Sequence, residues 1–474
     1  MPAIRSASFA FLALSAVLAH APAQAADDGE AAFRSLYKEL VETNTTLSAG
    51  SCTDAAQKMA AHLRAAGYGD ADLKIYAPDD RPKDGALVAT LPGRDAGLKP
   101  VLLLAHLDVV EAKRADWQRD PFTLVEEDGW FYARGASDDK AMAAVFTDSL
   151  IRYKREGFRP RRGIKLALTC GEETPQDFNS VYWLLKTRPK VLDAAFALNE
   201  GAGGELDADG KPVALQIQAG EKVYQDYRLE TRNPGGHSSR PTHDNAIYEL
   251  AAALTRLGAY SFPVTFNDAT RGYFEQQARL SPPDVAADMR AVLKNPQDDA
   301  AVERLWARNP GWNSMLRTTC VATMADAGHA ANALPQRATA NINCRILPGV
   351  APEAVREQLI RVVGDDRVSV TMEEEPSTGI NLPPPLTAGI LGPVQKLAAR
   401  MWPGVTVVPT MSTGATDSRF LNGAGIPSYG LSGMFHDAEG SHAHGLDERI
   451  RVQSLLDGRR FLYEIVKVYA TQRD

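Results

Sequence analysis

Two adjacent glutamates, Glu172 and Glu173, stand just after the apolar run 164–169. Such a run is typical of a strand that enters a protein core. Burial disfavours the charged form of a carboxyl group, and each carboxylate also disfavours the ionisation of its neighbour. A solvated loop would explain the pair by itself, so the pair indicates chemistry only if positive charge lies nearby.

Other side chains that can bind metals stand at similar places in the sequence. Each lies just after an apolar run, just before a predicted helix, or near the C-terminus; they are His106, Asp108, Asp138, Asp139, Glu200, His442 and His444. Taken singly, each has an ordinary explanation, such as a helix cap or a solvated strand end. Together they gather carboxylates and imidazoles at one edge of a sheet. Ligands of these types, without a thiolate, suit zinc or a similar divalent ion, and their number indicates two ions.

The elements that must position these residues alternate along the chain. Apolar runs at 101–105, 164–169 and 194–198 predict buried strands, and the pattern over 141–153 predicts a helix. This alternation predicts a doubly wound α/β domain, in which ligand sites lie at the carboxyl ends of the strands.

The pattern changes near residue 221. Alternating runs predict strands at 224–231, 314–325, 337–346 and 367–372, and a helix is expected over 245–257. These elements predict an α+β domain with a four-stranded antiparallel sheet and a helical insertion at about 260–313. We therefore predict a catalytic domain in two parts, 26–220 and 377–474, interrupted by an inserted domain at 221–376.

Composition excludes some partners and indicates export. The 474-residue chain has a net charge of −7, so it has no basic footprint for nucleic acid and no attraction to an anionic membrane. Arg5, the apolar run 9–18 and the sequence Ala23-Gln24-Ala25 predict a signal peptide over residues 1–25. We expect a periplasmic or secreted protein with no membrane span after cleavage.

Four cysteines remain in the expected mature chain, and an even number permits two disulfides in an oxidising compartment. Three connectivities are possible. Cys320 and Cys344 lie on two predicted strands that can pair, so a bond between them is one candidate.

The ordered motifs of this chain resemble the M20 family of dinuclear zinc peptidases. That family includes glutamate carboxypeptidases, aminoacylases, desuccinylases and carnosinase-like dipeptidases. The motifs that carry the resemblance are HLDVV, W…DPF…DGWFYARGASDDK, GEE, LNEG, NPGGHSSRP…NAI, NALP…INCRILPG, GATDSR and HGLDE. They span essentially all of the mature chain.

The resemblance implies two Zn²⁺ ions per subunit, with Co²⁺ able to substitute. The implied ligands are His106 and Glu200 at one ion, Glu173 and His444 at the other, and Asp138 as the bridge. The peptide bond that follows the bridging aspartate is typically cis in the family. His442 is the rival of His444, but only His444 stands four residues before Glu448, as the motif requires.

The resemblance also assigns catalytic roles. Glu172 would remain free of metal and act as the general base and acid. Asp108 would accept the second ring N–H of His106 and fix its tautomer. The inserted domain would serve as a lid and dimerisation domain, and His237 would reach across a homodimer interface to stabilise the oxyanion.

Substrate contacts are implied at Asn332 and Arg345, with Arg345 as a fork for a terminal carboxylate. Asp417 and Arg419 in GATDSR are either substrate contacts or parts of a structural turn, and the sequence does not separate these alternatives.

The leading hypothesis is an exported di-zinc hydrolase that releases a C-terminal amino acid, as a carboxypeptidase or an N-acyl-amino-acid hydrolase. A carnosinase-like dipeptidase is the alternative. A catalytically inactive binding protein on the same fold is a remote third possibility.

Overall fold

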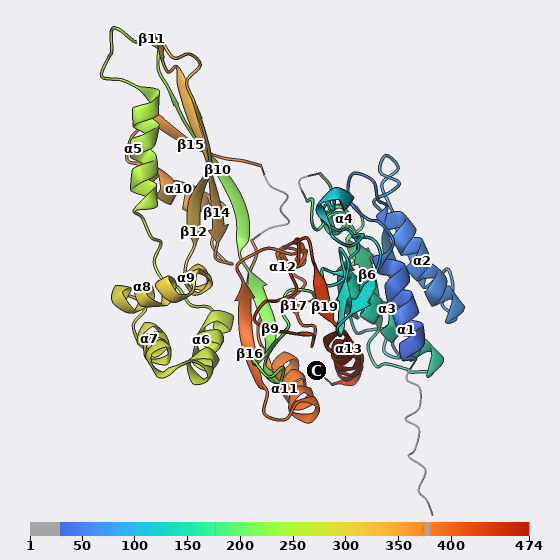
Figure 1. The fold of residues 1–474 in the computed structure, drawn as a ribbon. Helices are drawn as coiled ribbons and strands as arrows, with labels where there is room; N and C mark the ends of the chain where they lie inside the picture. The colour runs from blue at the N-terminus through green and yellow to red at the C-terminus, as the bar shows by residue number, and fades with distance from the viewer. Residues whose placement is uncertain (1–28, 176, 375–379, 474) are drawn as a thin grey trace, which may run out of the picture.

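The computed structural model describes residues 29–175, 177–374 and 380–473. The predicted signal peptide, residues 1–25, lies outside these described residues. The chain forms a broad α/β part and a long inserted part that extends away from it (Figure 1). Among the described helices, none has the length and apolar character that a membrane span requires.

A mixed sheet forms the centre of the α/β part. Its strand order is β1-β2-β6-β3-β7-β17-β9-β8-β18, with β16 added beside β9. Strand β3 runs parallel to both of its neighbours, β6 and β7, so the carboxyl ends of these strands meet at one edge. The strands are Leu73–Tyr76 (β1), Ala86–Leu91 (β2), Val101–His106 (β3), Ile164–Thr169 (β6), Phe196–Asn199 (β7), Gly204–Leu206 (β8), Pro212–Glu221 (β9), Thr406–Ser412 (β16), Ser428–Gly430 (β17) and Phe435–His436 (β18).

Helices cover both faces of this sheet. Along β3, Leu103 and Ala105 enter one core while Leu102 and Leu104 enter the other, which explains why the run is apolar throughout. The first core is formed with Glu30–Val41 (α1), Cys52–Ala65 (α2), Lys140–Arg155 (α3), Ala388–Met401 (α11) and Val452–Thr471 (α13). The second is formed with Ser180–Thr187 (α4) and Ser418–Gly423 (α12). The predicted α/β class is confirmed.

The inserted part contains the predicted four-stranded antiparallel sheet, in the order β12-β14-β10-β15. Its strands are Val223–Arg232 (β10), Thr319–Ala327 (β12), Arg337–Ile346 (β14) and Val368–Met372 (β15), and Ala246–Gly258 (α5) and Pro352–Val363 (α10) cover one face. The strand predicted at 314–325 begins too early. Asn309 caps a short helix, Pro310–Leu316 (α9), and the strand starts only at Thr319.

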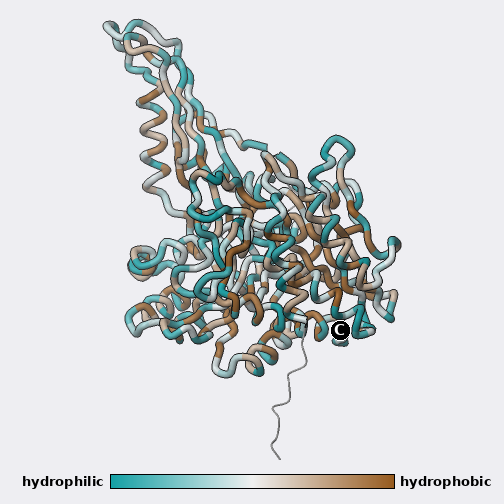
Figure 2. The backbone as a smooth tube through the Cα atoms, turned by 45° about the vertical axis from the view of Figure 1, so that its right-hand side comes forward, coloured by the Kyte–Doolittle hydropathy of each residue, from teal (hydrophilic) through white to brown (hydrophobic). Residues whose placement is uncertain are grey.

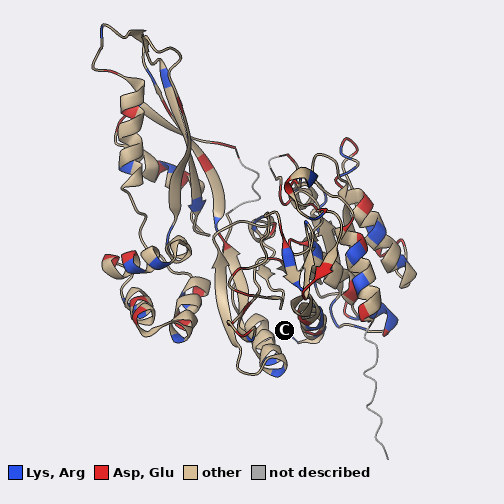
Figure 3. Cartoon of the chain, in the orientation of Figure 1, with Lys and Arg blue, Asp and Glu red and all other residues tan. Residues whose placement is uncertain are grey.

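Four helices occupy the region between α5 and β12: Asp268–Leu280 (α6), Pro283–Lys294 (α7), Asp299–Arg308 (α8) and α9. They have a core of their own, and α6 packs against β16 of the large sheet. Figure 3 shows acidic and basic residues interspersed on α6, α7 and α8, which is typical of solvent-facing helices. The cluster therefore rests on the α/β part, while α5 and the four-stranded sheet project beyond it (Figure 1).

Two disulfides cross-link the described chain. Cys320 and Cys344 join the paired strands β12 and β14, which was one of the pairings that the sequence permitted. The second bond joins Cys52 on α2 to Cys170, which follows β6. One disulfide therefore lies in each part of the molecule.

Candidate metal centre

The three parallel strands β6, β3 and β7 bring the predicted ligands to one edge of the sheet. His106 is the last residue of β3, Glu173 follows β6, and Glu200 follows β7. Asp138 lies on the loop that leads into α3, and His444 comes from the segment before Arg449–Arg451 (β19). Residues from five separate segments therefore meet at one place.

The carboxylate of Asp138 lies between two histidines. Its Oδ1 is 3.0 Å from Nε2 of His106, and its Oδ2 is 3.3 Å from Nε2 of His444. The Asp138–Asp139 peptide bond is cis, as predicted. Each carboxylate oxygen thus faces a different imidazole, which is the arrangement that a bridging ligand requires.

Each histidine also faces a glutamate. Oε1 of Glu200 is 3.8 Å from Nε2 of His106, and Oε1 of Glu173 is 2.9 Å from Nε2 of His444. His106, Asp138 and Glu200 form one group, and Asp138, Glu173 and His444 form another, with the ligand atoms of each group within 4.8 Å of one another. Imidazole and carboxylate donors at this spacing fit two divalent ions that share Asp138.

Electrostatics favours the same interpretation. Burial holds the pKa of Glu200 well above its usual range, and the nearby Glu172 and Asp138 carboxylates act in the same direction. Hydrogen bonds that the ring of His444 donates to the carboxylates of Asp138 and Glu173 raise its pKa to about 10. Carboxylates that stabilise the protonated form of a neighbouring histidine to this extent are also suited to bind metal cations.

The rival histidine lies elsewhere. His442 forms an ion pair with Asp447, with Nδ1 2.9 Å from Oδ2, and takes no part in either ligand group of the described residues. The motif spacing therefore selected the histidine that the fold places at the centre.

The role predicted for Asp108 needs a correction. The backbone carbonyl of Asp108, 2.9 Å from Nδ1 of His106, accepts the ring N–H, whereas the nearest carboxylate oxygen is 3.7 Å away. Because a carbonyl can only accept, Nδ1 carries the proton and Nε2 is left free toward Asp138. The tautomer is fixed as expected, but by the main chain.

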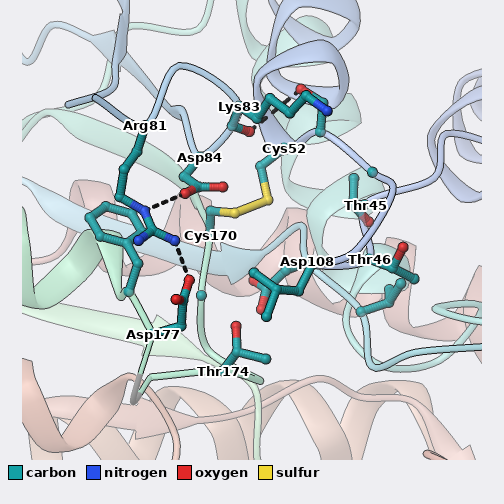
Figure 4. Close-up of a pocket in the computed structure, with 16 residues that line it drawn as sticks. Thr45, Thr46, Cys52, Arg81, Lys83, Asp84, Asp108, Cys170, Thr174 and Asp177 are labelled. Atoms are coloured by element: carbon teal, nitrogen blue, oxygen red, sulfur yellow. Dashed lines mark hydrogen bonds and ion pairs between the residues drawn. A yellow bond between two sulfur atoms is a disulfide. The ribbon is translucent and has the colours of Figure 1, made fainter. Parts of the chain in front are cut away.

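The carboxylate of Asp108 instead holds the loop that bears the glutamate pair. Its Oδ2 accepts a hydrogen bond from the backbone N–H of Glu173, at 3.0 Å. Figure 4 shows Asp108 beside the Cys52–Cys170 disulfide, which fixes the end of β6 just before this loop. Two anchors therefore constrain the position of Glu172 and Glu173.

Glu172 differs from Glu173 in its contacts. No hydrogen bond or ion pair to its side chain is found among the described residues, although it lies within ligand distance of His106 and Glu173. Burial holds the pKa of Glu172 well above its usual range; Asp417, Glu173 and Asp108 add to this effect, while His106 opposes it. A carboxyl group that is free of partners and has a raised pKa is suited to accept and return protons.

The chain is similar to known proteins over most of its length. Residues 102–468 match the family described as peptidase family M20/M25/M40. The human N-fatty-acyl-amino acid synthase/hydrolase PM20D1 is 30% identical over 404 residues, which are 81% of this chain and 77% of that protein. The chain belongs to the M20 peptidase family.

Two further similarities support this assignment. Aminoacylase-1 of Mus musculus is 26% identical over 378 residues, covering 78% of this chain and 80% of that protein. The M20 family metallo-carboxypeptidase Sso-CP2 of Sulfolobus solfataricus has the same fold, with a TM-score of 0.68 at 20% identity, and the match covers 92% of this chain and 99% of that one. As a member of the M20 family, the chain is a hydrolase that acts on amide bonds.

Glu448, a buried residue, holds the loop that carries Asp138. In the sequence it served only to identify His444, which stands four residues before it. Oε1 of Glu448 accepts hydrogen bonds from the backbone N–H groups of Ser137 and Asp138, at 2.9 and 3.0 Å. Its Oε2 accepts from Arg134 Nη1 and from the Gly135 N–H, at 2.7 and 3.0 Å. The one available signal was a glutamate at the end of HGLDE, which the structure places directly before β19.

Asp417 of the GATDSR motif holds the segment around the glutamate pair through hydrogen bonds. Asp417 is 2% exposed, and its two oxygens accept hydrogen bonds from Thr169 Oγ1 at 3.2 Å and from Asn179 Nδ2 at 2.6 Å. Asn179 also donates to the carbonyl of Gly171. Of the two alternatives left open for Asp417, the structure favours the structural one, because its oxygens are occupied in holding the glutamate loop.

Two predicted catalytic and substrate residues lie far from the metal ligands of their own chain. His237 lies on Gly236–His237 (β11), which pairs with Ala333–Leu334 (β13), and the carbonyl of Asn332 accepts from the Ser238 N–H at 3.0 Å. This two-stranded antiparallel pair is at the far tip of the inserted part (Figure 1), where the chain is mainly hydrophilic (Figure 2). Both residues are exposed.

Arg345 lies at the opposite end of the inserted sheet, close to the α/β part. Its guanidinium lies over the ring of Tyr224, 4.7 Å from the centroid, and its Nε donates weakly to Asn343 Oδ1 at 3.4 Å. Burial and the nearby Arg419 lower its pKa, and no ion pair to a carboxylate is found among the described residues. The structure therefore brings five predicted ligands and Glu172 together, keeps Arg345 near the junction, and separates His237 and Asn332.

Proposed function

We propose that this M20 hydrolase is an exported enzyme that uses two zinc ions to cleave N-acyl amino acids into a carboxylic acid and a free amino acid. The observation that carries the proposal is the unpartnered Glu172 beside two ligand groups that share Asp138. The similarity to a human N-fatty-acyl-amino acid synthase/hydrolase and to a mouse aminoacylase supports this substrate class over a carnosinase-like dipeptidase. A carboxypeptidase would use the same groups on a peptide.

Two zinc ions held by the two groups would supply Lewis acidity, which polarises the amide carbonyl and makes water a stronger acid. Glu172 accepts one proton from the attacking water and returns it to the leaving nitrogen, so that the products are a carboxylate and an amine. Glu448, Asp417 and the Asp108 carboxylate hold the loops that carry these groups. Positioning of this kind is needed because small displacements of a general base cost large factors in rate.

Arg345 is the proposed partner of the substrate α-carboxylate. A guanidinium without a carboxylate partner can form two parallel hydrogen bonds with such a group. Lys222, the single residue between β9 and β10, lies near it, and burial together with the Arg345 guanidinium lowers the pKa of Lys222 to about 7. This junction joins the catalytic sheet to the inserted sheet, so a substrate carboxylate there would contact the inserted part while its amide faces the metal ligands.

A homodimer is proposed because His237 and Asn332 are far from the site of their own chain. Strand β12 is an edge strand of the inserted sheet, and Val321 and Met324 on it are 56% and 72% exposed. Unpaired strand edges with exposed apolar side chains favour pairing with another chain. In such a dimer, His237 of one subunit would serve the centre of the other.

Export is supported by two observations. The segment 1–25 has the features of a signal peptide, and the four cysteines of the remaining chain form two disulfides. The N-terminus of the mature protein purified from a periplasmic or culture fraction would test this; an intact Met1 in a cytoplasmic fraction would contradict it.

The decisive experiment is a substrate panel. The purified mature chain, loaded with Zn²⁺ or Co²⁺, is incubated with N-acyl amino acids of increasing acyl length and with dipeptides, and released amine is measured. We expect N-acyl amino acids to be cleaved fastest and metal removal to abolish the activity. Faster cleavage of dipeptides would favour the dipeptidase, and a metal-loaded protein that releases no amine would contradict the proposal.

A further inference from the structure

A second cavity lies in the inserted part, apart from the metal ligands. Its volume is about 460 Å³, within the range of small-molecule sites. It lies where the end of α5 meets α8, α9 and the beginning of β12, a junction that Figure 1 shows below the four-stranded sheet. None of its lining residues is a metal ligand or Glu172.

Most of the cavity wall is apolar. Apolar lining side chains come from α5, the loop that follows it, α8, β12 and α10; they include Leu254, Leu257, Phe262, Trp306, Val321 and Leu359. Trp306 is 41% exposed although it is a large aromatic residue. Such a wall gains free energy when an apolar group replaces the water in front of it.

One charged side chain in this wall lacks a partner. Arg317 is 8% exposed, and within the described parts of the chain it forms no hydrogen bond and no ion pair. Its Nε is fully buried without an acceptor, and Oδ1 of the neighbouring Asn313 is buried without a donor. An Nε–H that is buried without an acceptor is costly, while Nη1 and Nη2, from which no group of the described residues accepts, are accessible to a ligand or to solvent.

The surroundings do not supply the missing anion. Burial lowers the pKa of Arg317, and the carboxylates of Asp299 and Glu303 oppose this effect only in part. Neither carboxylate forms an ion pair with the guanidinium. The neighbouring Thr318 is already engaged, since its hydroxyl accepts from the Leu347 N–H at 3.1 Å. The positive charge of Arg317 therefore faces the cavity without a counterion.

We propose that this cavity binds an alkyl carboxylate, with the carboxylate on Arg317 and the alkyl chain along the apolar wall. The guanidinium offers the two parallel N–H donors that a carboxylate accepts, and the wall offers the apolar contact that the chain requires. Two compounds share this chemistry, a free fatty carboxylate and an N-acyl amino acid. The site does not depend on the proposed catalytic function, because it uses separate residues.

Calorimetric titration of the full mature chain tests this proposal. Dodecanoate, dodecanol and N-dodecanoylglycine are titrated into the zinc-loaded Glu172→Gln variant, which should not consume the acylated probe. We expect saturable binding of dodecanoate and at least about tenfold weaker binding of dodecanol, because only the carboxylate pairs with Arg317. The carboxylate probe that binds more tightly identifies the source of the ligand.

Two further variants separate this cavity from the metal centre. Arg317→Leu keeps an apolar side chain and should weaken dodecanoate binding at least about tenfold, while dodecanol binding stays unchanged. Leu257→Trp should fill the cavity and weaken both probes. Arg308→Leu, which removes an exposed arginine of α8 paired with Asp284, is the matched control and should change neither.

Three outcomes would overturn the proposal. The first is no saturable binding of either carboxylate. The second is equal dodecanoate affinity in the Arg317→Leu and unsubstituted chains, which would place the probe at the metal centre. The third is binding that appears only when light scattering shows dissociation to monomers, because a second copy of the chain would then be the natural occupant of the cavity.

Discussion

The edge of the catalytic sheet and the tip of the inserted part differ in how they hold their functional residues. At the sheet edge, His106 and Asp108 are 2% and 5% exposed and are fixed by hydrogen bonds from several segments. At the tip, His237 and Asn332 are exposed at a short antiparallel strand pair. The groups at the sheet edge are brought together within one chain. The tip is too far from these groups in this conformation for His237 to stabilise an oxyanion at the centre of its own chain.

This difference indicates a division of labour. Buried polar networks keep a catalytic geometry because every displacement would leave a group unsatisfied. Exposed loops carry recognition groups that can meet a substrate or a partner. The largest effects on rate are therefore expected at the sheet edge, and effects that depend on association are expected at the tip.

The strongest test of the sheet edge is Glu172→Gln. Because the amide cannot accept the proton of the attacking water, we expect kcat to fall by about 10² to 10⁴-fold. The zinc content should stay at that of the unsubstituted enzyme, because Glu172 belongs to neither Asp138-sharing group. Steady-state kinetics and elemental analysis check both statements.

Glu173→Ala is the matched control for that variant. It removes a ligand from the group that contains His444, so zinc content should fall by about one ion per subunit along with activity. Loss of zinc from Glu172→Gln, or full zinc in Glu173→Ala, would reverse the roles assigned to the two neighbours.

At the tip, His237→Ala should reduce kcat by about 10² to 10³-fold, the usual cost of losing an oxyanion donor. His243→Ala, an exposed histidine of the same loop, should have little effect. Mixing His237→Ala with Glu172→Gln should restore about a quarter of the activity, because half of a random mixture is hybrid dimers with one complete site.

An active monomer by light scattering at assay concentration would contradict the contribution of His237 across an interface. Failure of the mixture to recover activity, under conditions in which subunits exchange, would contradict it as well.

Removing each disulfide in turn compares how much the bond in each region contributes to the free energy of unfolding. The Cys52–Cys170 bond closes a segment of 118 residues and the Cys320–Cys344 bond one of 24. Replacing each pair by serine should cost about 5 and about 3 kcal/mol of unfolding free energy, because longer loops gain more entropy when released. Chemical denaturation measures both. Only the first replacement should also lower kcat, since Cys170 stands two residues before Glu172; equal kcat losses would contradict this distinction.

The smallest effect is expected at the junction of the two regions. Burial lowers the pKa of Lys222 to about 7, and its Nζ donates to Ser314 Oγ and Thr319 Oγ1. The unfolded chain therefore binds more protons between pH 7 and about 10.5, so this residue makes stability rise with pH in that window, by about 1 to 2 kcal/mol from pH 7 to 9.

Lys222→Met should remove the contribution of Lys222 to the pH dependence of the unfolding free energy and leave the contributions of other groups. Subtracting the variant's unfolding free energy from that of the unsubstituted protein at each pH isolates this contribution. Identical slopes of stability against pH in the two proteins would show that Lys222 does not titrate as its burial requires.

Much of the α/β part was predictable because its signals are local. Continuous apolar runs identified the strands of the buried sheet, and four of the five predicted ligands stood at the end of a run or just before a helix. Where a local signal was ambiguous, prediction failed, as at 314–316, which was expected to begin a strand and instead forms the end of α9.

The hydrogen bonds that hold the loops of the candidate metal centre were not predictable from local signals. Glu448 contacts Asp138 across 310 residues of sequence, and Asp417 contacts Thr169 across 248. The use of the Asp108 carbonyl in place of its carboxylate depended on side-chain conformation, which no spacing determines. Likewise, the unpartnered state of Arg317 is visible only once its surroundings are known.

The sequence by itself determined the family, the fold class and the side chains that gather at the candidate metal centre, because residue type and position along a strand or loop are local properties. Only the tertiary structure decided which groups hold these side chains in place, such as Glu448 on the loop of Asp138 and the Asp108 carboxylate on the N–H of Glu173. It also placed His237 far from the centre that it was assigned to serve (Figure 1). The physical reason is that partners and distances arise from packing between segments that are remote in the chain.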